Sequence, residues 1–302
     1  MISFEEFQRQ RNKKYYITRG LDFLKDFKTF AGDKYFISAL AKDFYARVKK
    51  KGTINIYEMG IGAGTLFVSF MLSLRRLDAT FPERIVYHLC DISEELVRNA
   101  VKRGDAFGFN TDGIVYDGLP TFVKNADYIL SNELYSDLPA KLLMNDDGEI
   151  KELYIDDRKH FFKKFADGDI RAYMKRMPNG YIIPVNEHAK KHLLTCKKGL
   201  RAGGWLDIFD YGFASPSSIT ELPQKMWNAS IYREFGGQIT TDLNFHYIAQ
   251  GLNATIEPQK EFVERILGKH LIEDIDAMRY RECKVKTRIR EEGDFYHMRV
   301  VI

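Results

Sequence analysis

The chain runs Ile54-Asn-Ile-Tyr-Glu58-Met-Gly60-Ile-Gly62-Ala-Gly64-Thr65, in which an apolar segment leads to a carboxylate and then to three alternating glycines. The apolar residues are typical of a strand buried on both faces of a parallel sheet. Glycine adopts positive φ and has no Cβ, so a ligand can approach the backbone closely. Apolar residues then recur at helical spacing over 65–77, which places the glycines at a helix N-terminus, where free N–H groups favour electron-rich ligands. This stretch predicts a loop for a nucleotide-type cofactor.

The spacing of the glycines indicates which cofactor. A dinucleotide fingerprint that starts at Gly60 needs a glycine where Thr65 stands, and no Gly-Lys-Ser/Thr follows to hold a triphosphate. An acid two residues before three alternating glycines is typical of S-adenosylmethionine methyltransferases, in which the carboxylate faces the positively charged aminoacyl end of the cofactor. We therefore predict that S-adenosyl-L-methionine binds Glu58, Gly60, Gly62 and Gly64. The alternative is a glycine-rich turn without a ligand.

Composition favours a globular protein of the reducing cytoplasm. With 302 residues, of which 45% are hydrophobic, the chain can bury a large core. The net charge of +4 is spread along the sequence and does not indicate a nucleic-acid partner. Cys90, Cys196 and Cys283 lie far apart without a C-x-x-C pair, which predicts reduced core thiols. The first residues are acidic and no apolar run is long enough for a membrane span, so we expect a cytoplasmic location without membrane association.

Strands and helices alternate between residues 53 and 140. This alternation predicts βαβ units in an α/β fold with a doubly wound, mostly parallel sheet. We expect an N-terminal helical cap (1–50), the cofactor-binding half of the main domain (51–140), an insertion near the substrate site (141–185) and the remainder of the domain (186–302). The predicted strands are 53–59, 85–91, 113–116 and 127–132, and the predicted helices are 64–77 and 93–104.

The second half of the chain is less regular. Asn145-Asp-Asp-Gly148 lies between two short apolar runs and predicts a hairpin turn. The lysine-rich segment 159–176 is expected to be a solvated helix. Beyond the insertion, the predicted elements are a helix at 187–200, a strand at 205–209, and an antiparallel pair of strands at 283–289 and 295–301 joined by a turn at 291–294.

Acids follow the predicted strands at the edge where ligands bind in open α/β sheets. Asp91 ends the second strand, and its carboxylate could accept hydrogen bonds from two ribose hydroxyls. The alternative for Asp91 is the N-cap of the next helix. Asp117 follows the third strand and could accept a hydrogen bond from the adenine amino group, with Leu119 packed against the ring. An ordinary Asp-Gly turn is the alternative there.

The fourth strand ends in Asn132-Glu133-Leu-Tyr-Ser-Asp137-Leu-Pro139, which would place three polar groups near the sulfonium of the cofactor. Methyl transfer is an in-line displacement that depends on holding the two reactants in position. We predict that Asn132 binds the cofactor and that Glu133 and Asp137 are catalytic, because carboxylates can accept a proton and can orient a cationic acceptor such as a guanidinium. Helix capping is the alternative for these two acids.

Two further motifs carry weaker signals. His188 and His192 stand four residues apart on one helix face, a spacing compatible with a metal. Because the sequence shows no third ligand, we expect a solvated helix face and no metal. Asp210-Tyr211-Gly212 ends the fifth strand and is expected to line the wall of the pocket.

Taken in order over residues 13–302, these motifs resemble the MidA family of S-adenosylmethionine-dependent methyltransferases. The glycine loop is similar to that of the family, and Asn132 to Pro139 resembles its Asn-Glu-Phe-Phe-Asp-Ala-Leu-Pro, with Ser136 where the family has its acid. The other matching segments are Tyr15-Tyr16, Lys25-Asp26-Phe27-Lys-Thr29, Asp91-Ile-Ser93, Asp210-Tyr211-Gly212, Gln238-Ile-Thr240-Thr-Asp242-Leu-Asn-Phe245 and Pro258-Gln259-Lys-Glu-Phe262.

The resemblance implies a Rossmann-like class I methyltransferase fold and, from the mitochondrial member of the family, arginine N-methylation of a protein. We therefore expect a methyltransferase whose substrate is a protein. Two alternatives are a non-catalytic assembly factor that keeps the fold and a methyltransferase that acts on a small molecule or a nucleic acid. The sequence at Asn132 is not the Asn/Asp-Pro-Pro-Tyr/Phe motif of enzymes that methylate amino groups of nucleic-acid bases, which argues against that substrate.

Overall fold

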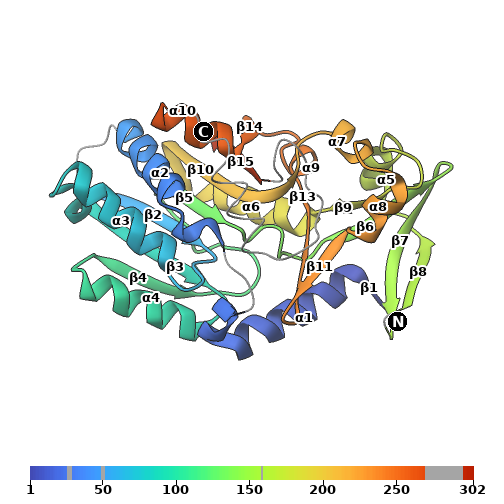
Figure 1. Ribbon diagram of the computed structural model, residues 1–302, viewed down its shortest axis with the longest axis horizontal. Helices are drawn as coiled ribbons and strands as arrows, with labels where there is room; N and C mark the ends of the chain where they lie inside the picture. The colour runs from blue at the N-terminus through green and yellow to red at the C-terminus, as the bar shows by residue number, and fades with distance from the viewer. Residues whose placement is uncertain (26–28, 49–51, 158, 269–294) are drawn as a thin grey trace.

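A computed structural model describes residues 1–25, 29–48, 52–157, 159–268 and 295–302. Its centre is a sheet in which the described residues form eight strands, in the order β14-β15-β10-β5-β2-β3-β4, with β13 beside β10 (Figure 1). The five strands from β10 to β4 are parallel, and β15 is antiparallel to both of its neighbours. The strands are β2 (Ile54–Met59), β3 (Ile85–Asp91), β4 (Thr111–Val115), β5 (Ala126–Asn132), β10 (Leu200–Phe213), β13 (Leu243–Asn244), β14 (Ala254–Pro258) and β15 (Phe295–Val301).

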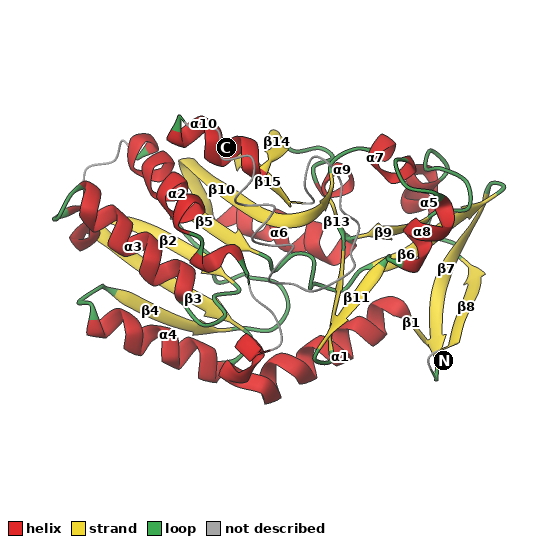
Figure 2. Ribbon diagram, viewed as in Figure 1, coloured by secondary structure: helices red, strands yellow, loops and turns green. Residues whose placement is uncertain are grey.

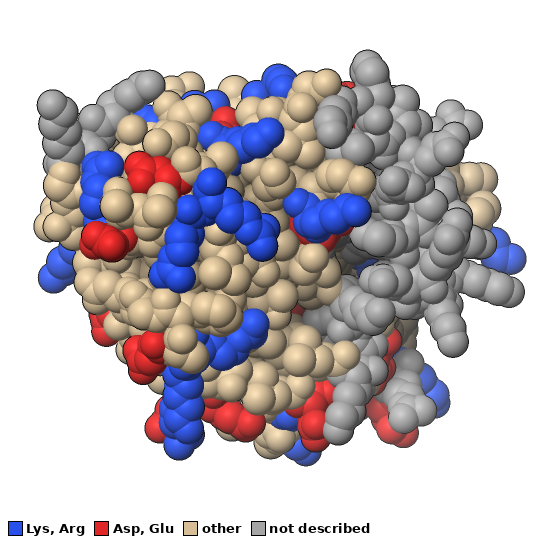
Figure 3. All heavy atoms as spheres, turned by 60° about the vertical axis from the view of Figure 1, so that its left-hand side comes forward, with Lys and Arg blue, Asp and Glu red and all other residues tan. Residues whose placement is uncertain are grey.

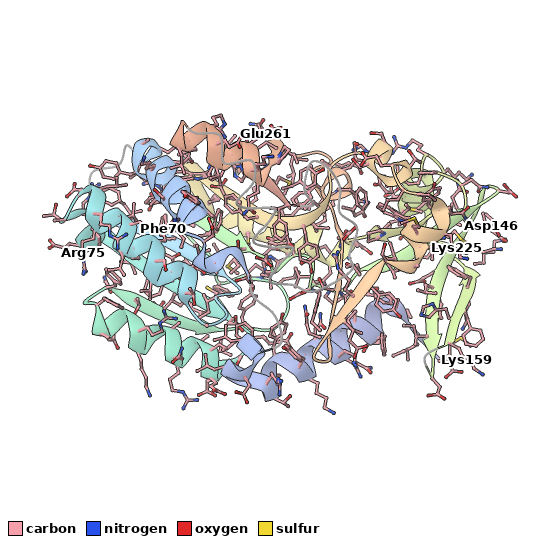
Figure 4. The ribbon with its side chains drawn as sticks, in the orientation of Figure 1. Phe70, Arg75, Asp146, Lys159, Lys225 and Glu261 are labelled. Atoms are coloured by element: carbon pink, nitrogen blue, oxygen red, sulfur yellow. The ribbon has the colours of Figure 1, made fainter. Side chains whose placement is uncertain are left out.

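Helices cover both faces of this sheet, so the predicted doubly wound fold is confirmed (Figure 2). Alternate side chains of a strand point to opposite faces. Ile54 and Ile56 of β2 pack with helices α2 (Lys34–Arg47), α3 (Thr65–Leu77) and α10 (Gln259–Leu267). Phe70 of α3 contacts Phe44 of α2, with 5.4 Å between their ring centroids (Figure 4). On the other face, Met59 shares a core cluster with residues of α6 (Glu187–Gly199).

The helices that follow β2 and β3 begin close to the predicted residues. Helix α3 starts at Thr65, directly after Gly64 in the left-handed conformation. Helix α4 (Glu94–Ala106) has Ser93 as its N-cap, whose Oγ accepts a hydrogen bond from the N–H of Leu96. The alternative that made Asp91 the N-cap is therefore wrong.

The segment 141–185 contributes to a second sheet, ordered β1-β7-β6-β9, with β8 paired to β7 (Figure 1). The predicted hairpin is confirmed: β6 (Lys141–Asp146) and β7 (Glu149–Asp156) are antiparallel, and Asp147 and Gly148 between them both have positive φ. The remaining strands of this sheet are β1 (Ile2–Ser3), β8 (Lys159–Lys164) and β9 (Ile182–Val185).

The solvated helix predicted over 159–176 is wrong in its first part. Residues 159–164 form strand β8, antiparallel to β7, and only Gly168–Met174 form a helix, α5. All six side chains of β8 are exposed, and three of them are lysines, which suit an edge strand because their charge discourages pairing with another chain. Lys159 and Asp146 both lie at the end of the molecule far from α3 (Figure 4).

Helix α1 (Phe4–Arg19) packs against β12 and against β6 and β7 of the second sheet, and it is held by buried amide side chains. Gln8 donates to the carbonyls of Ser136 and Ile239 and accepts a hydrogen bond from the N–H of Ala140 at 2.9 Å. Ile239 belongs to a two-stranded sheet of β11 (Tyr232–Phe235) and β12 (Gln238–Thr241). The shorter elements are η1 (Gly20–Lys25), η2 (Phe30–Gly32), η3 (Phe81–Arg84), α7 (Pro216–Thr220), α8 (Gln224–Ala229) and α9 (Phe245–Ile248).

The predicted C-terminal strand is confirmed as β15, which pairs with β10 and β14. The partner strand predicted at 283–289, the turn at 291–294 and Cys283 lie outside the described residues, as do residues 26–28 of an early family motif. Cys90 and Cys196 are free and buried, as predicted. In the described part of the chain, no helix has the length and apolar character to cross a membrane. Basic and acidic side chains both occur on the face shown in Figure 3.

Candidate active site

A cavity of about 510 Å³ lies at the carboxyl ends of the central strands, where the sequence places the cofactor. Helix α1 and the segment after β5 complete its wall. Of the predicted site residues, Gly64 and Leu119 do not line the cavity; the side chain of Leu119 is exposed instead. The predicted residues that line it are Glu58, Gly60, Gly62, Asp91, Asp117, Asn132, Glu133 and Asp137.

The glycines of the loop make room for neighbouring protein groups. Gly60 and Gly62 have φ of 75° and 51°, which glycine adopts without strain. A Cβ at Gly60 would come within 3.1 Å of the Leu134 side chain, and one at Gly62 within 3.2 Å of the Phe23 ring. At Gly64 it would lie 2.9 Å from Cβ of Ala100 in α4. The glycines thus let η1, α4 and the segment after β5 close around the loop, while Gly60 and Gly62 still line the cavity.

Asp91 fastens the glycine loop to the end of β3. Its two oxygens accept hydrogen bonds from the backbone N–H groups of Gly62, at 3.1 Å, and Ser93, at 3.0 Å. Burial raises the pKa of Asp91 to about 6, although these hydrogen bonds favour the ionised form. Because a carboxylate accepts about four hydrogen bonds, Asp91 keeps the capacity for two ribose hydroxyls.

Glu58 is buried at the end of β2, with 2% of its surface exposed. The Tyr87 hydroxyl donates a 2.6 Å hydrogen bond to its Oε2. Burial raises the pKa of Glu58 to about 8, with a smaller contribution from the nearby charge of Asp91. A cation placed against Glu58 would therefore bind with release of a proton.

The segment after β5 turns sharply at Glu133. This residue has φ of 55°, in the left-handed region that non-glycine residues rarely adopt, and its N–H donates to the carbonyl of Phe209 at 2.8 Å. The Nδ2 of Asn132 lies 3.4 Å from Oε1 of Glu133. Within the described residues, the Oδ1 of Asn132 is buried without a hydrogen-bond partner. A buried acceptor without a partner is expected to receive a donor from a ligand.

Asp137 is held by side chains from two distant segments. Its carboxylate accepts hydrogen bonds from the Tyr16 hydroxyl of α1 and from the Gln238 amide of β12. Burial raises the pKa of Asp137 to about 7, and the charge of Glu133 adds to the shift. Residues 133–140 form no helix, so the helix-capping alternative for Glu133 and Asp137 is wrong.

Asp210 stands behind this segment. The carboxylate is fully buried and accepts hydrogen bonds from the N–H groups of Ser136, at 3.0 Å, and Tyr211, at 2.9 Å. Burial raises the pKa of Asp210 to about 8, and the charges of Glu133 and Asp137 contribute. Asp210, Tyr211 and Gly212 do not line the cavity, so their expected place in the pocket wall is corrected. Asp210 instead supports the backbone that carries the two predicted catalytic acids.

The rim of the cavity is charged. Asp117 lies there in an exposed ion pair with Lys13, with 2.7 Å between Oδ2 and Nζ. Arg9, one helical turn before Lys13, and His188 of α6 also line the cavity.

The two histidines of α6 differ in exposure. His192 is fully buried, so the solvated face expected for the two histidines is wrong for His192. The described residues contain no group of three or more His, Cys, Asp or Glu side chains that could hold a metal ion.

Several lining residues were not predicted as site residues. Tyr16 and Phe23 line the cavity from the N-terminal segment; Gln238 of β12 does not line it but contacts Asp137. Tyr16 and Gln238 both belong to segments that match the MidA family, and this match was the sequence signal that could have identified them as site residues.

The cavity residues fit S-adenosyl-L-methionine. Glu58 is a buried carboxylate beside the glycine loop, Asp91 has spare acceptor capacity, and Asn132 has an unpartnered buried oxygen. Together with the strand order and the parallel direction of β2, β3 and β5, they define a class I methyltransferase.

Comparison with known proteins gives the family. Residues 37–260, more than half of the chain, match the family described as "Putative S-adenosyl-L-methionine-dependent methyltransferase". The chain belongs to this family, and it is an S-adenosyl-L-methionine-dependent methyltransferase. The resemblance to MidA proteins is confirmed at this level. No curated protein sequence matches the chain.

Two crystal structures from Burkholderia thailandensis share the fold. One is a COG1565 superfamily member bound to S-adenosylhomocysteine, with 19% sequence identity and a TM-score of 0.74 over 100% of this chain and 88% of that one. The other, a native structure of a COG1565 superfamily protein, has 18% identity and a TM-score of 0.73 over 100% of this chain and 87% of that one. At these identities the likeness concerns the fold.

Proposed function

We propose that this methyltransferase modifies a protein and that the methyl acceptor is the guanidinium of an arginine. The observation that carries the proposal is the position of Glu133 and Asp137, two acids that line the same cavity as the cofactor residues. The resemblance to the MidA family, whose mitochondrial member methylates arginine, supports the same acceptor.

A cationic acceptor suits these two acids. The charge of Glu133 helps to raise the pKa of Asp137, which means that the two ionised carboxylates repel each other. A cation between them would remove this repulsion and favour both ionised forms. The planar guanidinium carries five N–H donors and can bridge two carboxylates, whereas a lysine ammonium has three donors at a single point.

The proposal also includes the fate of the proton. When bound, S-adenosyl-L-methionine would supply a methyl group on a positively charged sulfur; the acceptor nitrogen would attack the methyl carbon in line as the carbon–sulfur bond breaks, and neutral S-adenosylhomocysteine would leave. We assign the proton that the nitrogen loses to the carboxylate of Asp137. Tyr16 and Gln238 hold that carboxylate in one orientation, and Glu133 holds the remaining guanidinium N–H groups.

A labelling experiment tests the proposal. Purified protein is incubated with methyl-labelled S-adenosyl-L-methionine and a lysate of the organism that produces it, and the labelled species is identified. We expect methylarginine in an acid hydrolysate of the labelled protein, and loss of label with Glu133→Gln or Asp137→Asn. Label in RNA, lipid or a small molecule would contradict a protein substrate, and label on lysine would contradict arginine. Binding of S-adenosylhomocysteine without any transfer would favour the non-catalytic alternative.

A further inference from the structure

The imidazole of His192 lies between two tyrosine hydroxyls behind the cavity. The Tyr116 hydroxyl is 3.0 Å from Nε2, and the Tyr135 hydroxyl is 3.0 Å from Nδ1. His192 is fully buried, and the Tyr135 ring packs edge-on against it with 5.2 Å between centroids. Each ring nitrogen therefore has a tyrosine hydroxyl within hydrogen-bonding distance, and Nδ1 also lies 3.7 Å from Sγ of Cys196 in the same helix.

The chemistry of imidazole suits this bridge. Burial lowers the pKa of His192 to about 3, so the ring is neutral at physiological pH. A neutral imidazole has one N–H donor and one acceptor nitrogen, so it accepts a hydrogen bond from one tyrosine and donates to the other. Either tautomer satisfies both contacts, and a phenylalanine at 192 would satisfy neither. One neutral ring thus connects the two tyrosine hydroxyls, with Cys196 as a further neighbour of Nδ1.

The two tyrosines belong to different halves of the site. Tyr116 lines the cavity, immediately precedes Asp117, and donates its backbone N–H to the carbonyl of Asp91 at 3.0 Å. Tyr135 lies between Glu133 and Asp137 in the chain but is fully buried and does not line the cavity. The bridge therefore joins the segment expected to hold adenine and ribose to the segment expected to hold the acceptor.

We propose that His192 is a positioning residue that couples cofactor binding to the placement of the Glu133–Asp137 segment through Tyr116 and Tyr135. When the cofactor fixes Tyr116, the imidazole transmits the constraint to Tyr135 and hence to the two acids. That the cavity binds S-adenosyl-L-methionine follows from the family to which the chain belongs. Only the role given to Glu133 and Asp137 rests on the proposed function.

The decisive variant is Tyr135→Phe, because it removes one hydroxyl that does not reach the cavity. We expect it to weaken S-adenosylhomocysteine binding about fivefold in calorimetry, the size of a modest coupling between sites. His192→Phe should weaken binding at least as much. In the His192→Phe background, Tyr135→Phe should cause no further loss, since the connection is already broken.

Tyr173→Phe is the matched control. Tyr173 is also buried, and its hydroxyl is hydrogen-bonded to Asn244, outside the bridge and the cavity. It should lower the melting temperature without changing the dissociation constant. If a purely structural role explained Tyr135, the two variants would behave alike.

Unchanged affinity in Tyr135→Phe, or full additivity with His192→Phe, would overturn the proposal. If His192→Phe does not fold, the double-mutant cycle of Tyr116→Phe and Tyr135→Phe replaces it. We expect the losses of S-adenosylhomocysteine affinity in the two single variants to be non-additive in the double variant. Additive losses would refute the coupling. The binding readout requires no methyl acceptor. Failure of the arginine assignment in the labelling experiment would therefore leave this test intact.

Discussion

The hydroxyl of Tyr87 donates a 2.6 Å hydrogen bond to Oε2 of Glu58, across the neighbouring parallel strands β3 and β2. Burial raises the pKa of Glu58 to about 8, and the tyrosine opposes this shift by stabilising the carboxylate. At neutral pH, Glu58 of the cofactor-free protein is therefore largely protonated. If Glu58 faces the ammonium of the cofactor, binding must ionise it.

Binding of S-adenosylhomocysteine at pH 7 should therefore release protons. Calorimetry in two buffers of different ionisation enthalpy measures the number released, and affinity should rise between pH 6 and 8 as ionisation becomes easier. Glu58→Gln should remove most of the proton release and weaken binding about tenfold, equivalent to about 1.4 kcal/mol. Tyr87→Phe should raise the pKa further and increase the release. An unchanged proton count in Glu58→Gln would show that the ammonium binds elsewhere.

Asp210 should make the cofactor-free protein less stable as pH rises. Its folded-state pKa of about 8 lies above its ordinary value of 3.8, so the unfolded chain binds fewer protons between these pH values. The stability linked to this group is fully present below the ordinary value and is lost as pH rises towards 8. We expect the free energy of unfolding to fall between pH 6.5 and 8, and to fall less steeply in Asp210→Asn. Equal slopes in chemical unfolding would contradict this assignment.

The parts of the fold with local signals were predictable from the sequence. The run that ends at Glu58, the glycines after it and the apolar spacing after Thr65 each depend on neighbouring residues, and β2 and α3 begin and end within two residues of the prediction. The hairpin at Asn145–Gly148 was equally local, because Asp147 and Gly148 adopt the positive φ that such turns require.

Strand β8 could not be predicted in this way. Lys159–Lys164 contains no strong turn or strand signal, and its pairing with β7 leaves all six side chains exposed. Tertiary context decides such a strand. The two-residue strand β1 depends on a partner about 150 residues away, Ile155 opposite Ile2, which no local pattern could indicate.

In the candidate site, too, features with a local sequence signal were predictable and contacts between distant segments were not. Acids at strand ends were predicted because the parallel sheet brings those ends together. The partners of Asp137 come from α1 and β12, which are far apart in the sequence, and only the folded structure shows that Tyr16 and Gln238 meet there.

The backbone strain at Glu133 leads to a third prediction. A non-glycine residue at φ of 55° costs about 1 kcal/mol relative to glycine. Both Glu133→Ala and Glu133→Gly remove the carboxylate and should abolish methyl transfer, but the glycine variant should be more stable by about 1 kcal/mol in chemical unfolding. The same pair at Asn125, whose φ is 50°, serves as a control that should show the stability difference with full activity. Equal stability of the two Glu133 variants would argue against strain.

Asn12 should link the stability of α1 to the active site. Its Nδ2 donates to the carbonyls of Asp137, at 2.8 Å, and Ile239, at 2.7 Å, while its Oδ1 accepts the N–H of Ile239 at 2.7 Å. Asn12→Ala leaves buried backbone groups unpaired and should lower the free energy of unfolding by about 1–3 kcal/mol. Asn12→Asp should lower it further above pH 5, because an ionised carboxylate cannot donate and would face two carbonyl oxygens.

Lys14→Ala is the matched control for Asn12, since Lys14 is an exposed residue of the same helix. It should change the free energy of unfolding by less than about 0.5 kcal/mol. If α1 served only to stabilise the fold, Asn12→Ala would retain normal turnover once folded. Because the same amide holds the backbone of Asp137, we expect turnover to fall in the folded fraction as well, measured with the acceptor found by labelling. Normal turnover together with lowered stability would restrict Asn12 to a structural role. It would also show that the position of Asp137 does not depend on its hydrogen bond to α1.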